Sequence, residues 1–121
     1  MKLRALRGAT TVSENSSAAI LEATEELVRE VMERNALSPE HMVSCLFTCT
    51  DDLNAQFPAL AARNLGLSAV PLLCAREIDV PGALPRTIRL MLHCYADEAA
   101  PARHVYLREA VGLRRDLEGA Q

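Results

Sequence analysis

The segment 87–95, TIRLMLHCY, constrains the fold of this chain more than any other stretch of the sequence. Its alternating pattern is typical of a β-strand, in which successive side chains point to opposite faces. One face would carry Ile88, Leu90, Leu92 and Cys94, and the other Thr87, Arg89, Met91, His93 and Tyr95. Because arginine keeps its charge, a partly buried Arg89 needs an anionic partner, which is either a protein carboxylate or a bound ligand.

The remaining sequence predicts further strands and two helices. Strands are expected at 2–12, 42–50, 68–78, 86–95 and 103–107, and helices at 16–34 and 58–65. The first helix is amphipathic and follows polar N-cap candidates in SENSS. Pro58 suits the first turn of the second helix, and Gly66 is placed to end it. Residues 108–121 are expected to form a short turn and a tail.

The order of these elements, β-α-β-α-β-β-β, predicts an α+β fold with a single mixed β-sheet and helices on one face. Several strands are apolar on both faces, and two helices cannot cover both. We therefore expect an oligomer built through the uncovered face, with Arg7 and Arg89 lining clefts between subunits. The 121 residues are expected to form a single domain, with a flexible C-terminal tail from about 114.

Composition argues against several classes of protein. A net charge of -3 and an aromatic content of 3% argue against a nucleic-acid partner. The four cysteines form no C-x-x-C pair, so free thiols are expected and no metal. The sequence contains no run of about 18 apolar residues, which argues against a membrane partner. We expect a cytoplasmic protein.

Four motifs together carry a resemblance to a known family: RGATTV, FPALAAR, VPLLCAREIDVPG and RHVYL. They occur in order along nearly the whole chain, which resembles the small monofunctional chorismate mutases of α/β type. The resemblance implies an isomerase that converts chorismate to prephenate in phenylalanine and tyrosine biosynthesis, without a cofactor or metal. It also implies a homotrimer that forms a pseudo-barrel, with sheets inside and helices outside.

Carried over position by position, the resemblance implies catalytic roles for Arg7, Glu77 and Arg89. It implies substrate-binding roles for Phe57, Arg63, Cys74, Tyr106, Leu113 and Arg114. Arg89 would meet the negative charge that develops on the ether oxygen. Departures from the family pattern are Leu60, Leu73 and Arg115, which stand where some members have a polar residue, threonine and proline respectively.

Structural roles compete with these assignments. Arg89 could pair with Glu77 merely as part of a strand, and Arg7 could be a charge on an edge strand. Cys74 could be a buried small hydrophobe, Phe57 a helix staple and Arg63 a helix-surface charge. The alternative function is that of a non-catalytic trimeric protein that binds a small carboxylate at its subunit interfaces.

Overall fold

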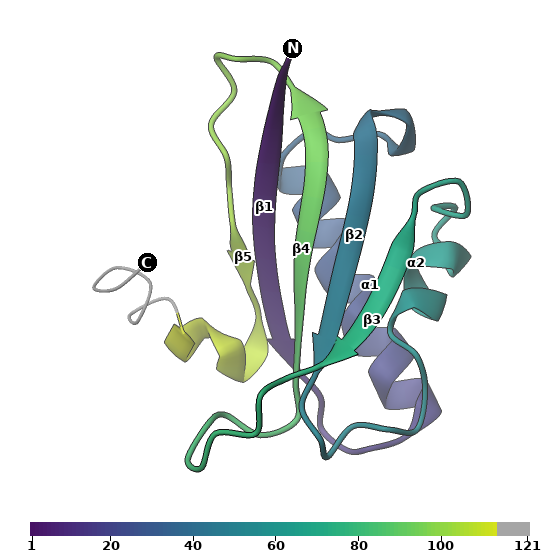
Figure 1. Cartoon of the computed structure of the whole chain (residues 1–121), viewed down its shortest axis with the longest axis vertical. Helices are drawn as coiled ribbons and strands as arrows, with labels where there is room; N and C mark the ends of the chain where they lie inside the picture. Colours follow the sequence, from purple (N-terminus) through teal and green to yellow (C-terminus); the bar gives the residue numbers. More distant parts are fainter. Residues whose placement is uncertain (114–121) are drawn as a thin grey trace.

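The computed structural model describes residues 1–113, which form one five-stranded sheet with both α-helices behind it (Figure 1). The strands are β1 (Lys2–Thr11), β2 (Met42–Cys49), β3 (Leu72–Arg76), β4 (Thr87–Ala96) and β5 (Val105–Tyr106). Their order across the sheet is β3-β2-β4-β1-β5. β4 runs antiparallel to both β1 and β2, whereas β3 and β5 pair in parallel with β2 and β1. The predicted mixed sheet and α+β class are confirmed.

The helices lie close to the predicted positions. α1 (Ser17–Arg34) is capped by Ser16, whose side chain accepts a hydrogen bond from the Ala19 N–H. α2 (Ala59–Asn64) follows Pro58, and Gly66 adopts a φ of 92° just beyond it. Two short 3₁₀ turns, η1 (Pro39–His41) and η2 (Arg108–Gly112), complete the elements of residues 1–113.

Two strands are shorter than the sequence predicts. β3 starts only at Leu72, because the preceding residues form a turn in which the Val70 N–H donates to the Leu67 carbonyl. β5 is reduced to Val105–Tyr106, which pairs with only Gly8 and Ala9 of β1. β1 nevertheless lies between β4 and β5 in the sheet. Arg7 is therefore not on an edge strand.

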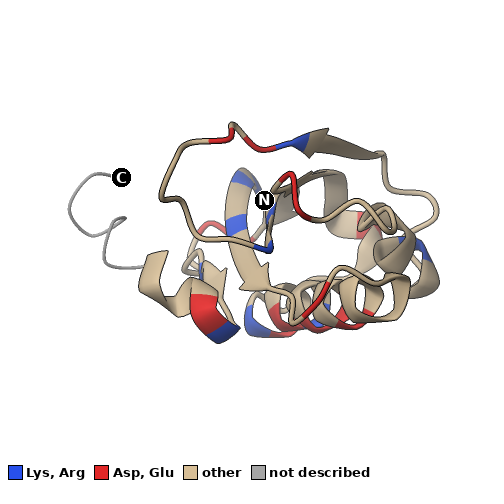
Figure 2. Ribbon diagram, turned by 90° about the horizontal axis from the view of Figure 1, so that it is seen from below, with Lys and Arg blue, Asp and Glu red and all other residues tan. Residues whose placement is uncertain are grey.

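The hydrophobic core lies between the sheet and α1. Gly8 of β1 allows the closest approach, since a Cβ atom there would lie 3.1 Å from Leu27 and 3.3 Å from Val31 of the helix. The largest fully buried core side chains of the strands include Phe47 and Leu92. The outer helix layer carries both acidic and basic segments, as Figure 2 shows, which is typical of a solvated helix surface.

The opposite face of the sheet is uncovered within residues 1–113 (Figure 1). It exposes several large apolar side chains, namely Leu3, Leu46, Leu73 and Tyr95. We call this surface the open face. None of the helices in the described part of the chain is long and apolar enough to cross a membrane.

Candidate active site

A row of side chains crosses the open face at the level of Arg89. Strand register places Thr48 of β2 opposite Arg89 of β4, and Arg89 opposite Ala9 of β1, which pairs with Tyr106 of β5. Because Ile88 and Leu90 on either side of Arg89 are buried in the core, Arg89 points to the open face. The predicted position of Arg89 on the face away from the core is confirmed.

Arg89 forms a two-point ion pair with Glu77, the residue that follows β3. Its Nε donates to Glu77 Oε1 at 2.6 Å, and its Nη2 donates to Oε2 at 2.5 Å. The Glu77 backbone N–H donates to the Cys49 carbonyl at 2.8 Å, which continues the pairing of β3 with β2. Thr48 adds a third side-chain contact, since its hydroxyl donates to Glu77 Oε1 at 2.5 Å. Glu77 is therefore held from both its backbone and its carboxylate.

The charges of this pair are stabilised by each other. The hydrogen bond from Arg89 lowers the pKa of Glu77, an effect that burial opposes and the Thr48 hydroxyl reinforces. The pKa of Arg89 is raised chiefly by the same hydrogen bond, and Tyr106 adds a smaller electrostatic contribution. The Glu77 side chain is only 12% exposed, whereas that of Arg89 is 54% exposed. Arg89 is thus anchored by one edge of its guanidinium while the other donors remain accessible to a ligand.

Arg7 lies on the same face of the neighbouring strand. It pairs with Met91, two residues along β4 from Arg89, so the two arginines are diagonal neighbours about 7–8 Å apart at their Cα atoms. The Arg7 backbone N–H donates to His104 Nδ1 at 3.0 Å. Burial and then the charge of Arg7 lower the pKa of His104, which favours the neutral imidazole that this hydrogen bond requires. The structure therefore brings Arg7, Glu77, Arg89 and Tyr106 to one region.

Phe57 lies just before α2 and Arg63 within it, and α2 contacts β3, the edge strand of the sheet. Phe57 is 70% exposed and Arg63 is exposed as well. Asn15 fixes the loop that precedes Phe57, because its Oδ1 accepts hydrogen bonds from the N–H groups of Asn54 and Ala55 at 3.1 and 3.0 Å. Neither side chain is brought to the row of Arg89 within one chain.

Cys74 occupies the other side of the sheet. It pairs with Phe47 of β2 and packs against the core, while its neighbours Leu73 and Ala75 are exposed. Strand alternation thus turns the Cys74 side chain away from Arg89. A partly buried small hydrophobe describes this position, as the competing interpretation proposed.

The end of the chain contributes one described candidate. Leu113 is half-buried and directly follows η2. Arg114, Arg115 and the tail expected from about 114 lie outside the described residues, so those predictions stay as they were.

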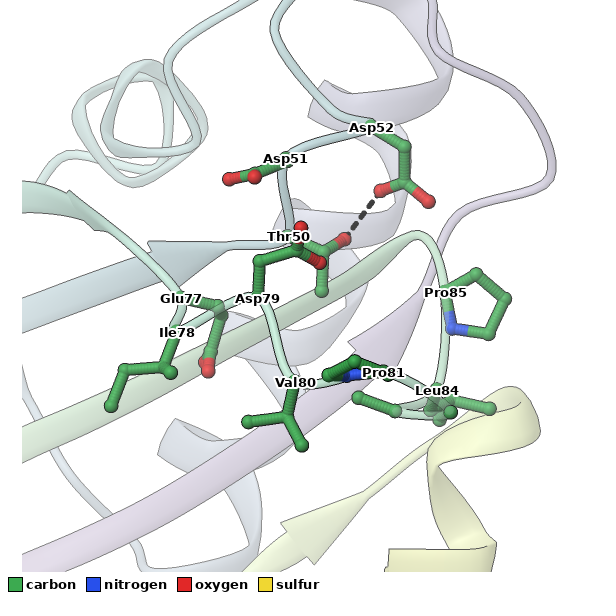
Figure 3. Close-up of a pocket in the computed structure, with 12 residues that line it drawn as sticks. Thr50, Asp51, Asp52, Glu77, Ile78, Asp79, Val80, Pro81, Leu84 and Pro85 are labelled. Carbon is green, nitrogen blue, oxygen red and sulfur yellow. Dashed lines mark hydrogen bonds between the residues drawn. The ribbon is translucent and has the colours of Figure 1, made fainter.

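A pocket that Glu77 itself helps to line is unsuited to an anionic ligand. It lies between the turn 50–52 and the loop 77–85, and its lining includes the carboxylates of Asp51, Asp52 and Asp79 (Figure 3). Asp52 accepts a hydrogen bond from Thr50, and Asp51 pairs with Arg76. An anion would be repelled here, so the cationic row on the open face is the better candidate.

Sequence reasoning did not single out Thr48 or assign His104 a role. One sequence signal could have pointed to Thr48. It is a polar residue between Phe47 and Cys49, which are apolar and lie on the core face of β2, so alternation places its hydroxyl on the open face. Within residues 1–113, no group of three or more His, Cys, Asp or Glu side chains is arranged to hold a metal ion.

Comparison with known proteins identifies the family. The family model for chorismate mutase type I matches residues 3–117. The chain belongs to this family. It is 50% identical over 121 residues to the chorismate mutase AroH of Thermus thermophilus, and the aligned region covers 98% of this chain and 99% of that protein. It is 43% identical over 119 residues to the AroH of Bacillus subtilis, covering 97% of this chain and 94% of the relative.

A solved structure shares the fold of this chorismate mutase. The chorismate mutase from Clostridium thermocellum superposes with a TM-score of 0.88 at 46% sequence identity, covering 91% of this chain and 99% of that chain. The resemblance recognised in the sequence is confirmed, and the non-catalytic alternative is not favoured by these relatives.

Proposed function

We propose that this chorismate mutase rearranges chorismate to prephenate beside Arg89, in crevices between the subunits of a homotrimer. The observation that carries the proposal is the two-point pair of Arg89 with Glu77 on the open face. It fixes a permanent cation by one edge and leaves its other N–H groups available to a ligand.

The reaction requires shape and charge complementarity more than acid or base chemistry. Chorismate is a dianion that rearranges through one cyclic transition state, in which the breaking C–O bond leaves negative charge on the ether oxygen. A guanidinium held at that oxygen binds the transition state more strongly than the substrate, which lowers the barrier. Arg89 is anchored and partly exposed, so it suits this role.

The neighbouring groups suit the remaining parts of the substrate. Arg7 would bind a carboxylate, assisted by the phenol of Tyr106. Glu77 would accept a hydrogen bond from the substrate hydroxyl while it keeps Arg89 aligned. The lowered pKa of Glu77 supports this role, because the carboxylate stays ionised and able to accept at neutral pH.

The open face and the β3 edge support the proposed assembly. Leu46 and Leu73 are 41% and 61% exposed on strands that pair with each other, which leaves a contiguous apolar surface suited to a second copy of the chain. Packing sheet against sheet would place helices outside. Phe57 and Arg63, exposed on the side of the molecule with the β3 edge, would then complete the site of a neighbouring subunit. Leu113 and Arg114 remain proposed contacts at its margin, whereas the side chain of Cys74 faces the core and is not placed there.

The magnitudes required are ordinary. A rate enhancement of about 10⁶ needs roughly 8 kcal/mol. One preorganised donor at a developing oxyanion supplies about 3–4 kcal/mol. Enforcing a compact substrate conformer can supply several kcal/mol more, within the ~7–11 kcal/mol that favourable positioning reaches.

The test is an absorbance assay that follows the loss of chorismate in plain buffer. We expect turnover by the wild type. For Arg89→Ala we expect kcat to fall by a factor of about 10³ or more, because the charge at the ether oxygen is lost. Arg89→Lys should also be poor, since a point charge on a flexible stem does not reproduce the fork.

Arg29→Ala is the matched control, because it removes a positive charge from the exposed surface of α1. It should keep the wild-type rate, and circular dichroism should show that all variants remain folded. A wild type without turnover, or an Arg89→Ala variant with full turnover, would contradict the proposal.

A further inference from the structure

The hydroxyl of Thr48 donates a hydrogen bond to Glu77, and the proposed reaction assigns no role to this contact. We propose that Thr48 is a positioning residue, which fixes the Glu77 carboxylate so that Oε2 rather than Oε1 meets the substrate. This inference rests on the proposed function and deepens it, because it assigns the substrate contact to one atom.

The occupancy of the two carboxylate oxygens carries the argument. Oε1 accepts from the Thr48 hydroxyl at 2.5 Å and from Arg89 Nε at 2.6 Å. Oε2 accepts from Arg89 Nη2 at 2.5 Å. Each ionised carboxylate oxygen offers about two lone-pair sites. Oε1 is therefore saturated, whereas Oε2 keeps one acceptor site for a donor from outside the chain.

The position of Thr48 in the sheet makes its hydroxyl a rigid donor. Thr48 lies on β2 between Arg89 of β4 and Ala75 of β3, with which it pairs directly. Its side chain is half-buried in this row. A β-branched residue in a strand has restricted χ1 rotation, so little conformational freedom is lost when the contact forms.

Loss of this hydroxyl would act through Glu77 and Arg89. With only Arg89 Nε left on Oε1, the carboxylate could rotate about the ion pair and carry the guanidinium with it. A displacement of the catalytic group affects the transition state more than the bound substrate. The expected signature is a lower kcat with little change in KM.

Thr48→Val tests the hydroxyl directly, because valine keeps the shape of threonine and removes the donor. We expect a kcat about tenfold lower with KM within about threefold of wild type, in line with the weight of a hydrogen bond to a charged group. Thr48→Ser restores the donor and should return kcat to within about threefold of wild type. Thr48→Ala provides a second hydroxyl-free variant if valine perturbs the strand.

Thr24→Val is the matched control, since it also removes one threonine hydroxyl, here one that donates to the Ile20 carbonyl inside α1. Its kcat should equal that of the wild type. A Thr48→Val variant with the wild-type kcat would overturn the proposal. A Thr48→Ser variant as impaired as Thr48→Val would do the same, because it would assign the effect to packing.

A second readout does not depend on turnover. ¹³C NMR of the Glu77 carboxyl should show a higher pKa in Thr48→Val than in wild type, because the Thr48 hydrogen bond favours the ionised form. The titratable and charged groups of the elements around Glu77 are Arg89, Cys49, Asp51, Asp52, Asp79, Arg76 and Tyr106.

Those groups are unchanged in the Thr48→Val variant, so an unaltered Glu77 pKa would overturn the proposal. If wild-type protein showed no turnover while the Glu77 pKa still rose in Thr48→Val, the proposed function would fail and the positioning contact would be supported. The two failures are therefore distinguishable.

Discussion

The two faces of the sheet are built from the same strands and serve different purposes. On β2, Phe47 is 0% exposed against the helices, while its neighbour Leu46 is 41% exposed on the open face. On β4, buried Leu90 adjoins Arg89 in the same way. Burial against α1 and α2 stabilises the fold, which leaves the open face able to hold charges that a hydrophobic core would exclude.

The largest effect that tests this difference is on stability. Phe47→Ala should lower the free energy of unfolding by about 3–5 kcal/mol, because a core cavity is left behind. In a dissociated chain, Leu46→Ala should cost less than about 1 kcal/mol, since its side chain is already 41% exposed there, and any further loss in the assembled protein belongs to the proposed interface. Denaturant unfolding at matched oligomeric state measures both. Equal losses would show that the two faces do not differ as the structure indicates.

A charge on the open face tests whether a second copy of the chain covers it. Leu46→Asp should shift the assembly toward monomers at least about tenfold, because burying an unpaired carboxylate is costly. Sedimentation velocity measures the shift, and circular dichroism checks that each chain stays folded. Ala18→Asp, on the exposed surface of α1, is the control and should assemble as the wild type does. Full assembly of Leu46→Asp would exclude this face as the interface.

A smaller effect is expected at the β5 side of the open face. Burial and the charge of Arg7 lower the pKa of His104, so the folded value lies below the unfolded value of about 6.5. The stability that this neutral imidazole contributes is fully present above the unfolded pKa and is lost as pH falls through the folded pKa. Protonation also removes the acceptor for the Arg7 N–H.

NMR titration of the His104 imidazole should therefore give a pKa below the ordinary value. At pH 5 the amide of Arg7 should exchange faster, after correction for intrinsic rates, than at pH 7. A His104 pKa at or above 6.5 would contradict the structure. Since His104 precedes Tyr106 on the same side of the sheet, the result also shows how firmly this side of the site is held.

Much of the fold follows from local pattern. The alternation of the segment 87–95 is enough to place Arg89 away from the core, and the cap at Ser16 and the stop at Gly66 are local signals. The motifs also sufficed to recognise the family and, through it, the candidate residues. The exact limits of β3 and β5 were not predictable, because they depend on which strands lie beside them.

By itself, the sequence determined the order of the elements, the faces on which the residues of β1 and β4 lie and the arginines that cannot enter the core. Only the tertiary structure decided that Thr48 lies beside Arg89 and that, within one chain, Phe57 and Arg63 belong to a different region, at α2. The physical reason is range. Helical and strand periodicities are set within a few residues, whereas lateral neighbours in a sheet depend on strand order, which chain closure over long separations establishes.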